Sequence, residues 1–264
     1  MKNIDLHVHF REEPEKYAKE LKKYGVEFAA PMANTKFCLD NLAKVLQYNQ
    51  KIKSIKPLPI SSITKKRAGK QLVNIKKIKP YVIGFSDDGN CLKNLKLLEQ
   101  ALNYDVMIIA HLEPETEMLE GYISTLAKMS KCGYLYFQHI SKKESINLIR
   151  KAKNSKLNIF AETCPQYFAF NKEFEDIKVN PPIGDEKDNE AILKGLKDGI
   201  IDVIASDFAP MPRPRKTGFA SYPTFIALCN WLVSSNILTQ KQLEDKLYNN
   251  PKKIIKLSNP KFKI

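Results

Sequence analysis

The feature that most constrains the fold is a repeated switch between short apolar runs and longer amphipathic stretches. Apolar runs with the length and composition of buried strands cover residues 4–9, 26–31, 58–63, 81–85, 106–111, 134–139, 157–161 and 201–205. Buried parallel strands need helical crossovers between them. Eight such units in 264 residues favour a closed (β/α)8 barrel, a TIM-type α/β fold, forming one domain over residues 1–264. A doubly wound open sheet is the alternative.

The stretches between these runs have apolar residues at the spacings of three and four that mark one face of a helix. They include Tyr17, Leu21 and Tyr24; Leu92, Leu95, Leu98 and Leu102; Met118, Ile123, Leu126 and Met129; and Ile146, Leu148 and Ile149. Two further helices are predicted at residues 225–233 and 240–247. Residues 64–79 are basic and only weakly periodic, so this segment is the least certain part of the prediction.

The composition, with 43% hydrophobic and 27% charged residues, is that of a water-soluble globular protein. No apolar stretch has the length of a membrane span, and Asp5, His7, His9 and Arg11 interrupt any signal-peptide core. We therefore expect a cytoplasmic protein with no membrane partner. The five cysteines are widely separated and form no CxxC pair, which argues against a zinc finger or a disulfide framework.

The net charge of +14 comes from 43 Lys and Arg against 29 Asp and Glu. The lysines are spread along the whole chain, mostly on the polar faces of the predicted helices, rather than clustered in one patch. We therefore expect no nucleic-acid partner. A positive field of this size suits the capture of a small anionic substrate.

All four histidines of the chain lie at the ends of predicted strands. His7 and His9 are two residues apart in the first run, so alternation along a strand points them the same way. His111 and His139 each end another apolar run. In a (β/α)8 barrel these strand ends converge on one face, where active sites lie.

Acidic residues follow the same rule. Asp87 and Asp88 come directly after the run 81–85, and Asp207 follows the run 201–205. Each has a simpler interpretation: Asp-Asp-Gly is a common turn, and Asp207 could cap the segment after it. His111 and His139 could be packed core residues. The coincidence of imidazoles and carboxylates at one barrel face instead predicts a catalytic site for Zn²⁺ or a similar metal.

The sequence at this point resembles the dihydroorotases, members of the amidohydrolase superfamily. The residues Asp5-Leu6-His7-Val8-His9-Phe10-Arg11-Glu12 are similar to the DxHVHxRE opening of that family. Seven further blocks recur in family order: Pro31–Thr35 (MPNT), Phe85–Gly89 (FSDDG), His111–Glu113 (HCE), His139–Ser141 (HVS), Glu162–Tyr167, Lys178–Pro182 (KVNPP) and Ile204–Pro210 (IATDHAP). Single blocks of this kind are weak signals, but eight in order are strong.

The resemblance implies reversible cyclisation of N-carbamoyl-L-aspartate to L-dihydroorotate in pyrimidine synthesis, with one or two zinc ions per chain. His7, His9 and Asp207 would hold the first metal, and His111 and His139 a second. Asp88, or failing that Asp87, would be the shared ligand, in the place that a carbamylated lysine takes in related enzymes. Asp207 would serve as general base and then acid. Arg11 and Asn34 would bind the substrate carboxylate, and Asn180 would contact the pyrimidine ring.

Three departures from the family pattern bear on substrate and activity. The family block DHAPH reads Asp207-Phe208-Ala209-Pro210-Met211, so both of its histidines are replaced, and Arg213 or Arg215 is a candidate substitute for the second. The tract from Gly84 to His111 is shorter than in relatives. The chain also ends soon after residues 252–255, which leads us to expect a short form without the small β-rich domain that flanks many relatives.

Two other functions therefore stay open at this point. One is hydrolysis of other cyclic amides of the hydantoin type, against which Arg11 and Asn34 argue because they suit an α-carboxylate. The other is a weakly active or inactive dihydroorotase-like partner of aspartate transcarbamoylase, against which the retained metal ligands argue. As assembly partners we consider aspartate transcarbamoylase and a second copy of the chain in a homodimer.

Overall fold

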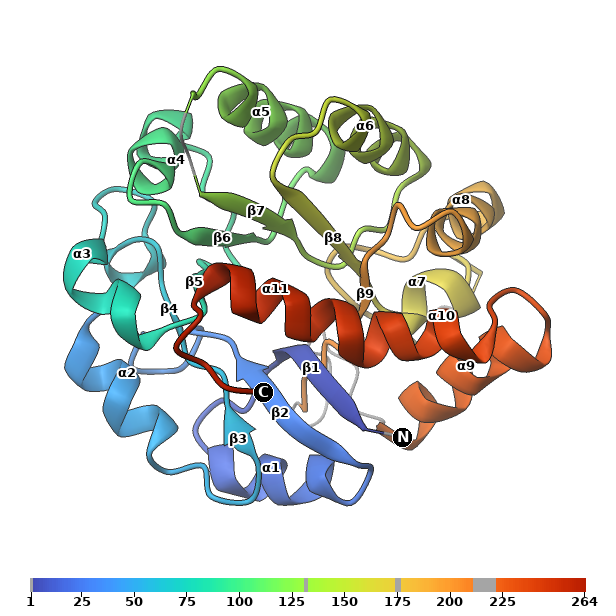
Figure 1. The fold of residues 1–264 in the computed structure, drawn as a ribbon, viewed down its shortest axis with the longest axis horizontal. Coiled ribbons are helices and arrows are strands. Elements are labelled where there is room, and N and C mark those ends of the chain that lie inside the picture. The colour runs from blue at the N-terminus through green and yellow to red at the C-terminus, as the bar shows by residue number, and fades with distance from the viewer. Residues whose placement is uncertain (1, 131–132, 174–176, 211–221) are drawn as a thin grey trace.

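The strands of the computed structural model alternate with helices along the chain and converge toward its centre (Figure 1). The structure describes residues 2–130, 133–173, 177–210 and 222–264. Its strands are β1 (Asn3–Val8), β2 (Val26–Pro31), β3 (Lys56–Pro57), β4 (Ile60–Ser61), β5 (Gly84–Phe85), β6 (Met107–Ala110), β7 (Tyr134–Phe137), β8 (Ile159–Thr163) and β9 (Val203–Ile204). Each of the eight predicted runs contains at least part of a strand.

The helices lie around the outside of the strands, with one exception described below (Figure 1). They are α1 (Pro14–Lys22), α2 (Leu42–Asn49), α3 (Ile75–Ile78), α4 (Leu95–Leu102), α5 (Glu115–Ala127), α6 (Lys143–Asn154), α7 (Pro165–Ala169), α8 (Glu186–Lys197), α9 (Tyr222–Ser234), α10 (Gln240–Glu244) and α11 (Asn250–Ser258). Short helical turns cover Lys65–Arg67 (η1), Lys79–Tyr81 (η2) and Asp245–Asn249 (η3). In the part of the chain that the structure describes, no helix combines the length and the apolar character that crossing a bilayer requires.

The strands are parallel and follow chain order, as expected for a (β/α)8 barrel. β1, β2 and β3 pair in one sheet, and β4 to β9 pair in a second. Residues Leu58 and Pro59 connect the two sheets, since the Leu58 amide donates to Ala29 of β2 and the Pro59 carbonyl accepts from Ile83. On the other side Val8 forms a parallel bridge with Phe208, just after β9. The ring of strands is a TIM-type barrel, held on these two sides by single contacts rather than by continuous ladders.

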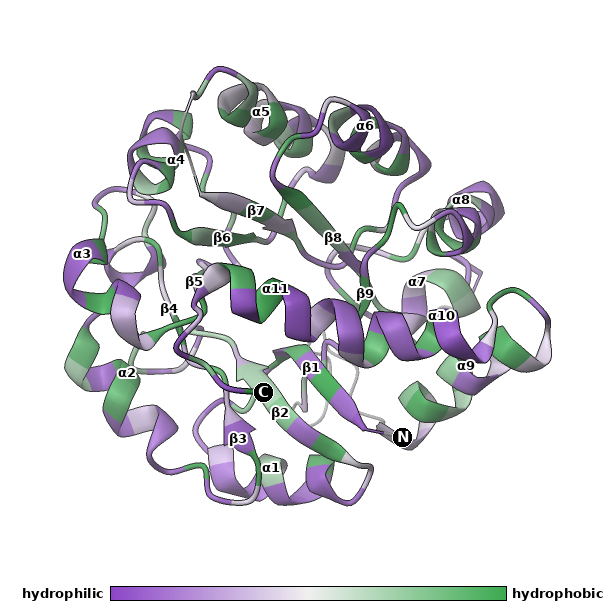
Figure 2. Ribbon diagram, in the orientation of Figure 1, coloured by the Kyte–Doolittle hydropathy of each residue, from purple (hydrophilic) through white to green (hydrophobic). Residues whose placement is uncertain are grey.

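Two apolar layers stabilise this arrangement. The inner layer fills the ring of strands with residues such as Leu6, Ile60 and Ile109, and the outer layer lies between the strands and the surrounding helices. Strands β6 and β8 are coloured mostly as apolar, β1 and β2 carry polar residues among apolar ones, and the surrounding helices are mixed (Figure 2). Burial of strands on both faces is the usual reason for near-continuous apolar runs, which is the pattern from which the fold was predicted.

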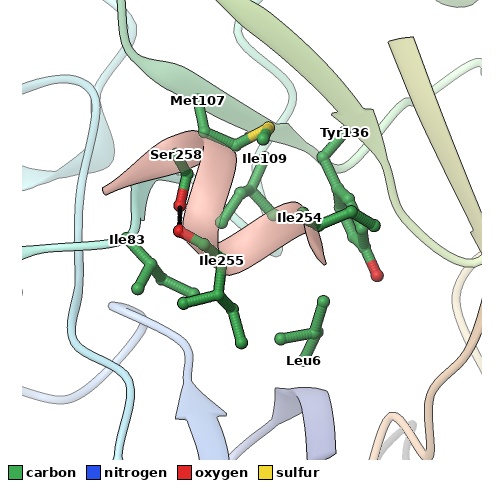
Figure 3. Close-up of a pocket in the computed structure, with 8 residues that line it drawn as sticks. All are labelled: Leu6, Ile83, Met107, Ile109, Tyr136, Ile254, Ile255 and Ser258. Carbon is green, nitrogen blue, oxygen red and sulfur yellow. Dashed lines mark hydrogen bonds between the residues drawn. The ribbon is translucent and has the colours of Figure 1, made fainter. Parts of the chain in front are cut away.

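Helix α11 is the exception among the helices, because it lies across one end of the ring (Figure 1). Its residues Ile254 and Ile255 pack against Leu6 of β1, Met107 at the start of β6 and Tyr136 of β7 (Figure 3). This end is formed by the beginnings of the strands. The opposite end, where the strands finish, carries the predicted site residues.

Two predicted elements differ from the structure. The helix expected at residues 240–247 is interrupted, because α10 passes into the π-helical turn η3 and then into α11. The strand expected at residues 81–85 starts only at Gly84, since Pro80 lies in the helical turn η2 and has no amide to donate to a ladder. The prediction of a single domain over residues 1–264 stays a prediction.

Candidate metal centre

A change of register in β1 directs His7, within this strand, and His9, just after it, into the site. The pairing of β1 with β2 shifts between Asp5 and Val8. Leu6 accordingly packs in the inner layer and Val8 in the outer layer, while the rings of His7 and His9 lie 5.1 Å apart. Irregularities of this kind commonly re-aim side chains next to active sites. Asp5 turns away and accepts a hydrogen bond from the Ser206 amide at 3.2 Å.

The residues predicted for the site come together at the end of the ring where the strands finish. They line a cleft of ≈160 Å³, whose walls include His9, Arg11, Asn34, Asp88, His111, His139, Asn180 and Asp207. His7 lies behind this wall and is fully buried. A cleft of this volume fits a small metabolite rather than a macromolecule.

Asp88 lies between two pairs of histidines. Its Oδ1 is 3.6 Å from Nε2 of His7 and 3.6 Å from Nδ1 of His111, and its Oδ2 is 3.6 Å from Nε2 of His9. His139 completes the second pair, with its Nε2 2.8 Å from Nδ1 of His111. Two groups of potential metal ligands therefore share Asp88: one with His7 and His9, the other with His111 and His139.

Asp207 also lies beside the first pair. Its Oδ1 lies 3.0 Å from Nε2 of His9 and 3.4 Å from Nε2 of His7. The backbone of Asp207 is left-handed, with φ of 48°, and His139 has φ of 35°. Such conformations are strained for residues other than glycine and cluster at functional sites.

The neighbouring aspartate, Asp87, does not face the histidines. Its Oδ1 accepts hydrogen bonds from the amides of Ile63 and Thr64 at 2.9 and 3.1 Å, and its Oδ2 accepts one from the Thr64 hydroxyl. Asp87 is therefore tied to the segment after β4. The structure favours Asp88 over Asp87 as the shared ligand.

The electrostatics of the site keep carboxylates ionised in a buried place. Burial opposes ionisation of Asp88, but the positive charges of His9 and His7 outweigh it and hold the pKa of Asp88 well below its usual value. Burial likewise opposes ionisation of Asp207, yet His7 and His9 lower its pKa. For His7, burial favours the neutral ring, but the charges of Glu162 and Asp207 raise its pKa well above the usual value.

His139 shows the reverse behaviour. Burial, together with the neighbouring imidazoles of His111 and His7, lowers the pKa of His139 to about 3. This imidazole is therefore neutral at physiological pH. The neutral imidazole is the form that binds a metal.

A divalent metal fits these residues on two observations. Nε2 of His7 is buried, and no hydrogen-bond partner for it is found in the part of the chain that the structure describes, although two carboxylates face it. Two donors of a tetrahedral zinc ion are about 3.3 Å apart, given bond lengths of about 2.0–2.1 Å. The separations of 3.0–3.6 Å among His7, His9, Asp88 and Asp207 are close to that value.

The predicted substrate residues lie beside this centre. Arg11 lines the cleft and donates from Nη1 to the carbonyl of Asn34 at 3.1 Å. The side-chain amide of Asn34 lies between two predicted ligands, with Oδ1 3.0 Å from Nδ1 of His9 and Nδ2 donating to Asp88 at 2.7 Å. Asn180 is 3.5 Å from Nε2 of His111. Its place at the rim is compatible with a contact to substrate.

The departure at Phe208 has a structural explanation. The Phe208 ring is buried and packs against the rings of Tyr17 and Tyr222, 5.7 and 6.3 Å away between ring centres. Its carbonyl accepts from the His9 amide at 2.7 Å. The side chain at this position thus belongs to the core beside the site. Met211, Arg213 and Arg215 lie outside the described residues.

Sequence reasoning missed two residues that contact the centre. Glu162 lies in the family block Glu162–Tyr167, to which the resemblance assigns no role, yet its Oε1 lies 2.7 Å from Nδ1 of His7. A carboxylate inside a buried strand is the signal that could have identified it. Arg67, in the segment without a clear prediction, donates to the carbonyl of Asp88 and so holds the loop that carries this predicted ligand.

Comparisons with known proteins identify relatives of this chain. A dihydroorotase of Caldicellulosiruptor saccharolyticus is 33% identical over 96% of this chain and 72% of the relative. Among solved structures, the L-hydantoinase of Arthrobacter aurescens superposes with a TM-score of 0.80 at 15% identity, over 96% of this chain and 70% of that one. A dihydroorotase of Campylobacter jejuni superposes with a TM-score of 0.78 at 17% identity, over the whole of this chain and 84% of that one. No protein-family model matches.

The two kinds of comparison support different statements. The solved structures, at 15 and 17% identity, bear on the fold and agree with the TIM-type barrel described above. The curated relative bears on the family, because its similarity extends over nearly the whole chain and most of its own length. This chain belongs to the dihydroorotase family of amidohydrolases.

Proposed function

We propose that this protein is a metal-dependent dihydroorotase that interconverts N-carbamoyl-L-aspartate and L-dihydroorotate in pyrimidine biosynthesis. One observation carries the proposal: two groups of potential metal ligands share Asp88 in a small cleft that Arg11 also lines. The dihydroorotase relative supports the choice of substrate.

The metal we propose is zinc, one or two ions per chain. His7, His9 and Asp207 would hold the first ion, His111 and His139 the second, and Asp88 would lie between them. Imidazole and carboxylate ligands without cysteine are typical of catalytic rather than structural zinc. When bound, the metal supplies Lewis-acid polarisation of the reacting carbonyl and makes water more acidic.

Asp207 is the residue we assign to proton transfer. In the cyclisation direction the ureido nitrogen forms a bond to the side-chain carboxyl carbon, and one water is released. The proton leaving that nitrogen would pass to a carboxylate oxygen of Asp207 and from there to the departing carboxyl oxygen, which takes a second proton from solvent and leaves as water. In the hydrolytic direction Asp207 would accept a proton from the attacking water and return it to the leaving nitrogen.

Arg11 is the residue we assign to the substrate carboxylate. A guanidinium offers a planar set of donors that matches a carboxylate in a two-point contact. Its bond to the Asn34 carbonyl orients the guanidinium at the cleft wall. Asn34 would assist from the loop after β2, and Asn180, which also lines the cleft, would contact the ring.

The experiment that tests this proposal measures metal content and turnover in one preparation. Protein loaded with Zn²⁺ should interconvert the two compounds in both directions, and Asp207→Asn should lose turnover while it retains metal at the second pair of histidines. Zinc-loaded protein without turnover in either direction would refute the activity.

Asp88 and Asp87 provide a matched pair for the metal. Asp88→Asn should reduce the zinc content and abolish turnover, because this carboxylate faces three histidines. Asp87→Asn should lower the melting temperature but keep the zinc, because its bonds go to Ile63 and Thr64. Equal loss of zinc in both variants would contradict the assignment of Asp88.

A panel of other cyclic amides tests the nearest alternative. Hydantoin and dihydrouracil lack the ring carboxylate that Arg11 would bind, so we expect them to be poor substrates. Faster turnover of either compound than of dihydroorotate would favour a hydantoinase-type function.

Partners and location remain predictions. Co-purification with aspartate transcarbamoylase would support a complex of the two proteins, and light scattering would show whether the chain forms a homodimer. Cell fractionation would test the cytoplasmic location.

A further inference from the structure

Glu162 is a carboxylate enclosed at the centre of the barrel. It lies on β8, is fully buried, and pairs through its backbone with Val203 of β9. A buried carboxylate is costly unless its oxygens are compensated by donors. The hydrogen-bond donors around Glu162 therefore indicate its role in the protein.

These donors belong to the metal centre and to the layer beneath it. Oε1 of Glu162 lies 2.7 Å from Nδ1 of His7 and also accepts from the backbone amide of His139 at 3.3 Å. Oε2 accepts from the Tyr136 hydroxyl at 2.6 Å. One carboxylate thus contacts a predicted ligand of the first metal, the backbone of a predicted ligand of the second, and a tyrosine of the inner layer.

The contact with His7 decides which nitrogen of that ring faces the cleft. A carboxylate accepts but does not donate, so Nδ1 of His7 must carry the hydrogen in this contact. In the neutral ring Nε2 is then left with its lone pair, directed at Asp88 and Asp207. Glu162 therefore selects the tautomer and the ring orientation that a metal requires from His7.

Tyr136 extends this chain of contacts to the opposite end of the barrel. Its ring packs against Ile254 and Ile255 of α11, and Figure 3 shows its hydroxyl pointing away from that helix. Both ends of the side chain are thus engaged: the ring by the helix that covers the strand beginnings, and the hydroxyl by Glu162.

We propose that Glu162 is a positioning residue of the first metal site, which orients His7 through Nδ1, and that Tyr136 holds Glu162 in place from below. This proposal rests on the metal centre of the proposed function. It concerns metal affinity and does not require a particular substrate. Carboxylates that hold a ligating histidine typically contribute a factor of about 10–100 to metal affinity.

The test is a titration of metal-free protein with Zn²⁺ followed by calorimetry, and with Co²⁺ followed by its visible spectrum. Glu162→Gln keeps the size of the side chain and removes the charge, and we expect the Kd of the first site to rise about 10–100-fold. Tyr136→Phe leaves Glu162 in place without one donor, and we expect a smaller rise. Both variants should shift the Co²⁺ spectrum, because the orientation of one ligand changes.

Two control variants remove buried groups of the same kind elsewhere. Glu115→Gln replaces a buried carboxylate that accepts from the amides of Ser141 and Lys142, and Tyr122→Phe removes a hydroxyl that donates to the Leu92 carbonyl. These controls should lower the melting temperature of the metal-free protein without changing the Kd of the first site.

An unchanged Kd in Glu162→Gln, or a rise no larger than that in Glu115→Gln, would overturn the positioning role. Wild-type protein that binds no Zn²⁺ or Co²⁺ would overturn it together with the proposed metal centre. Wild-type protein that binds metal but does not turn over dihydroorotate would refute the proposed activity alone, and the ratio of the Kd values would still decide the role of Glu162.

Discussion

Removal of metal should lower the melting temperature of this protein by an amount that can be worked out in advance. The folded chain brings His7 and His9 within 3.6 Å of both Asp88 and Asp207, whereas the unfolded chain separates these residues by up to 200 positions in sequence. A metal held by this set binds the folded state only. At a free metal concentration of 1,000 times Kd, one such site stabilises the folded state by about 4.1 kcal/mol.

The corresponding shift in melting temperature follows from the chain length. Unfolding entropies near 60 °C are about 2.1 cal/mol/K per residue, which for 264 residues is about 0.55 kcal/mol/K. One filled site should therefore raise the melting temperature by about 7 °C. The assay compares calorimetric scans in Zn²⁺ with scans after dialysis against a chelator. His7→Ala should lose most of the shift, whereas Asp87→Asn should keep it.

Identical melting temperatures with and without metal, in samples shown by elemental analysis to differ in zinc content, would refute the reasoning. That result would mean that the unfolded chain holds the ion as well as the folded chain does. It would also mean that the arrangement of the four side chains is not what binds the ion.

Three further predictions follow from particular contacts. Arg11→Lys should raise the KM for dihydroorotate at least about tenfold with a smaller effect on kcat in steady-state assays, because the two-point carboxylate contact is lost; an unchanged KM would contradict the assignment. Ile255→Ala should cost about 2–5 kcal/mol, or about 4–9 °C in calorimetry, because it opens a cavity under the barrel, while turnover at 25 °C is retained. Burial raises the pKa of Glu115, so the protonated side chain contributes to the stability of the folded state. This contribution is fully present below the pKa of Glu115 in the unfolded chain and is lost as the pH rises through its pKa in the folded protein. The stability advantage of wild type over Glu115→Gln, measured by denaturant titration, should therefore shrink as pH rises above about 4.5, the usual pKa of a glutamic acid; a constant difference would contradict this.

The architecture could be predicted from the sequence because the strands other than β3 are almost wholly buried and so appear as apolar runs. What the runs do not show is where pairing is interrupted. The predicted strand 58–63 contains Pro59, which cannot donate a ladder hydrogen bond, and within it the structure has only β4 at Ile60–Ser61, while β3 lies before it at Lys56–Pro57. The change of register in β1 likewise depends on how β1 pairs with β2, and the sequence of one strand does not reveal that pairing.

The gathering of the histidines at one end of the barrel was predictable for a simple reason: the ends of parallel strands lie on one face. The preference for Asp88 over Asp87 came from the family resemblance and not from the residue pattern, because it depends on which of two adjacent side chains the segment after β4 engages. The role of Glu162 was not predicted because it depends on contacts between distant segments. Glu162 is on β8, whereas its partners His7 and His139 are in β1 and just after β7.

The left-handed backbone at Arg11, His139 and Asp207 has a consequence for any attempt to rebuild this centre elsewhere. In that conformation the Cα–Cβ bond leaves the chain in a direction that an extended residue does not provide. The turning main chain, more than any choice of rotamer, thus sets where the imidazole and the carboxylate point. If these side chains are transplanted onto another barrel without the left-handed backbone at the three positions, the site should contain the same residues in the wrong geometry.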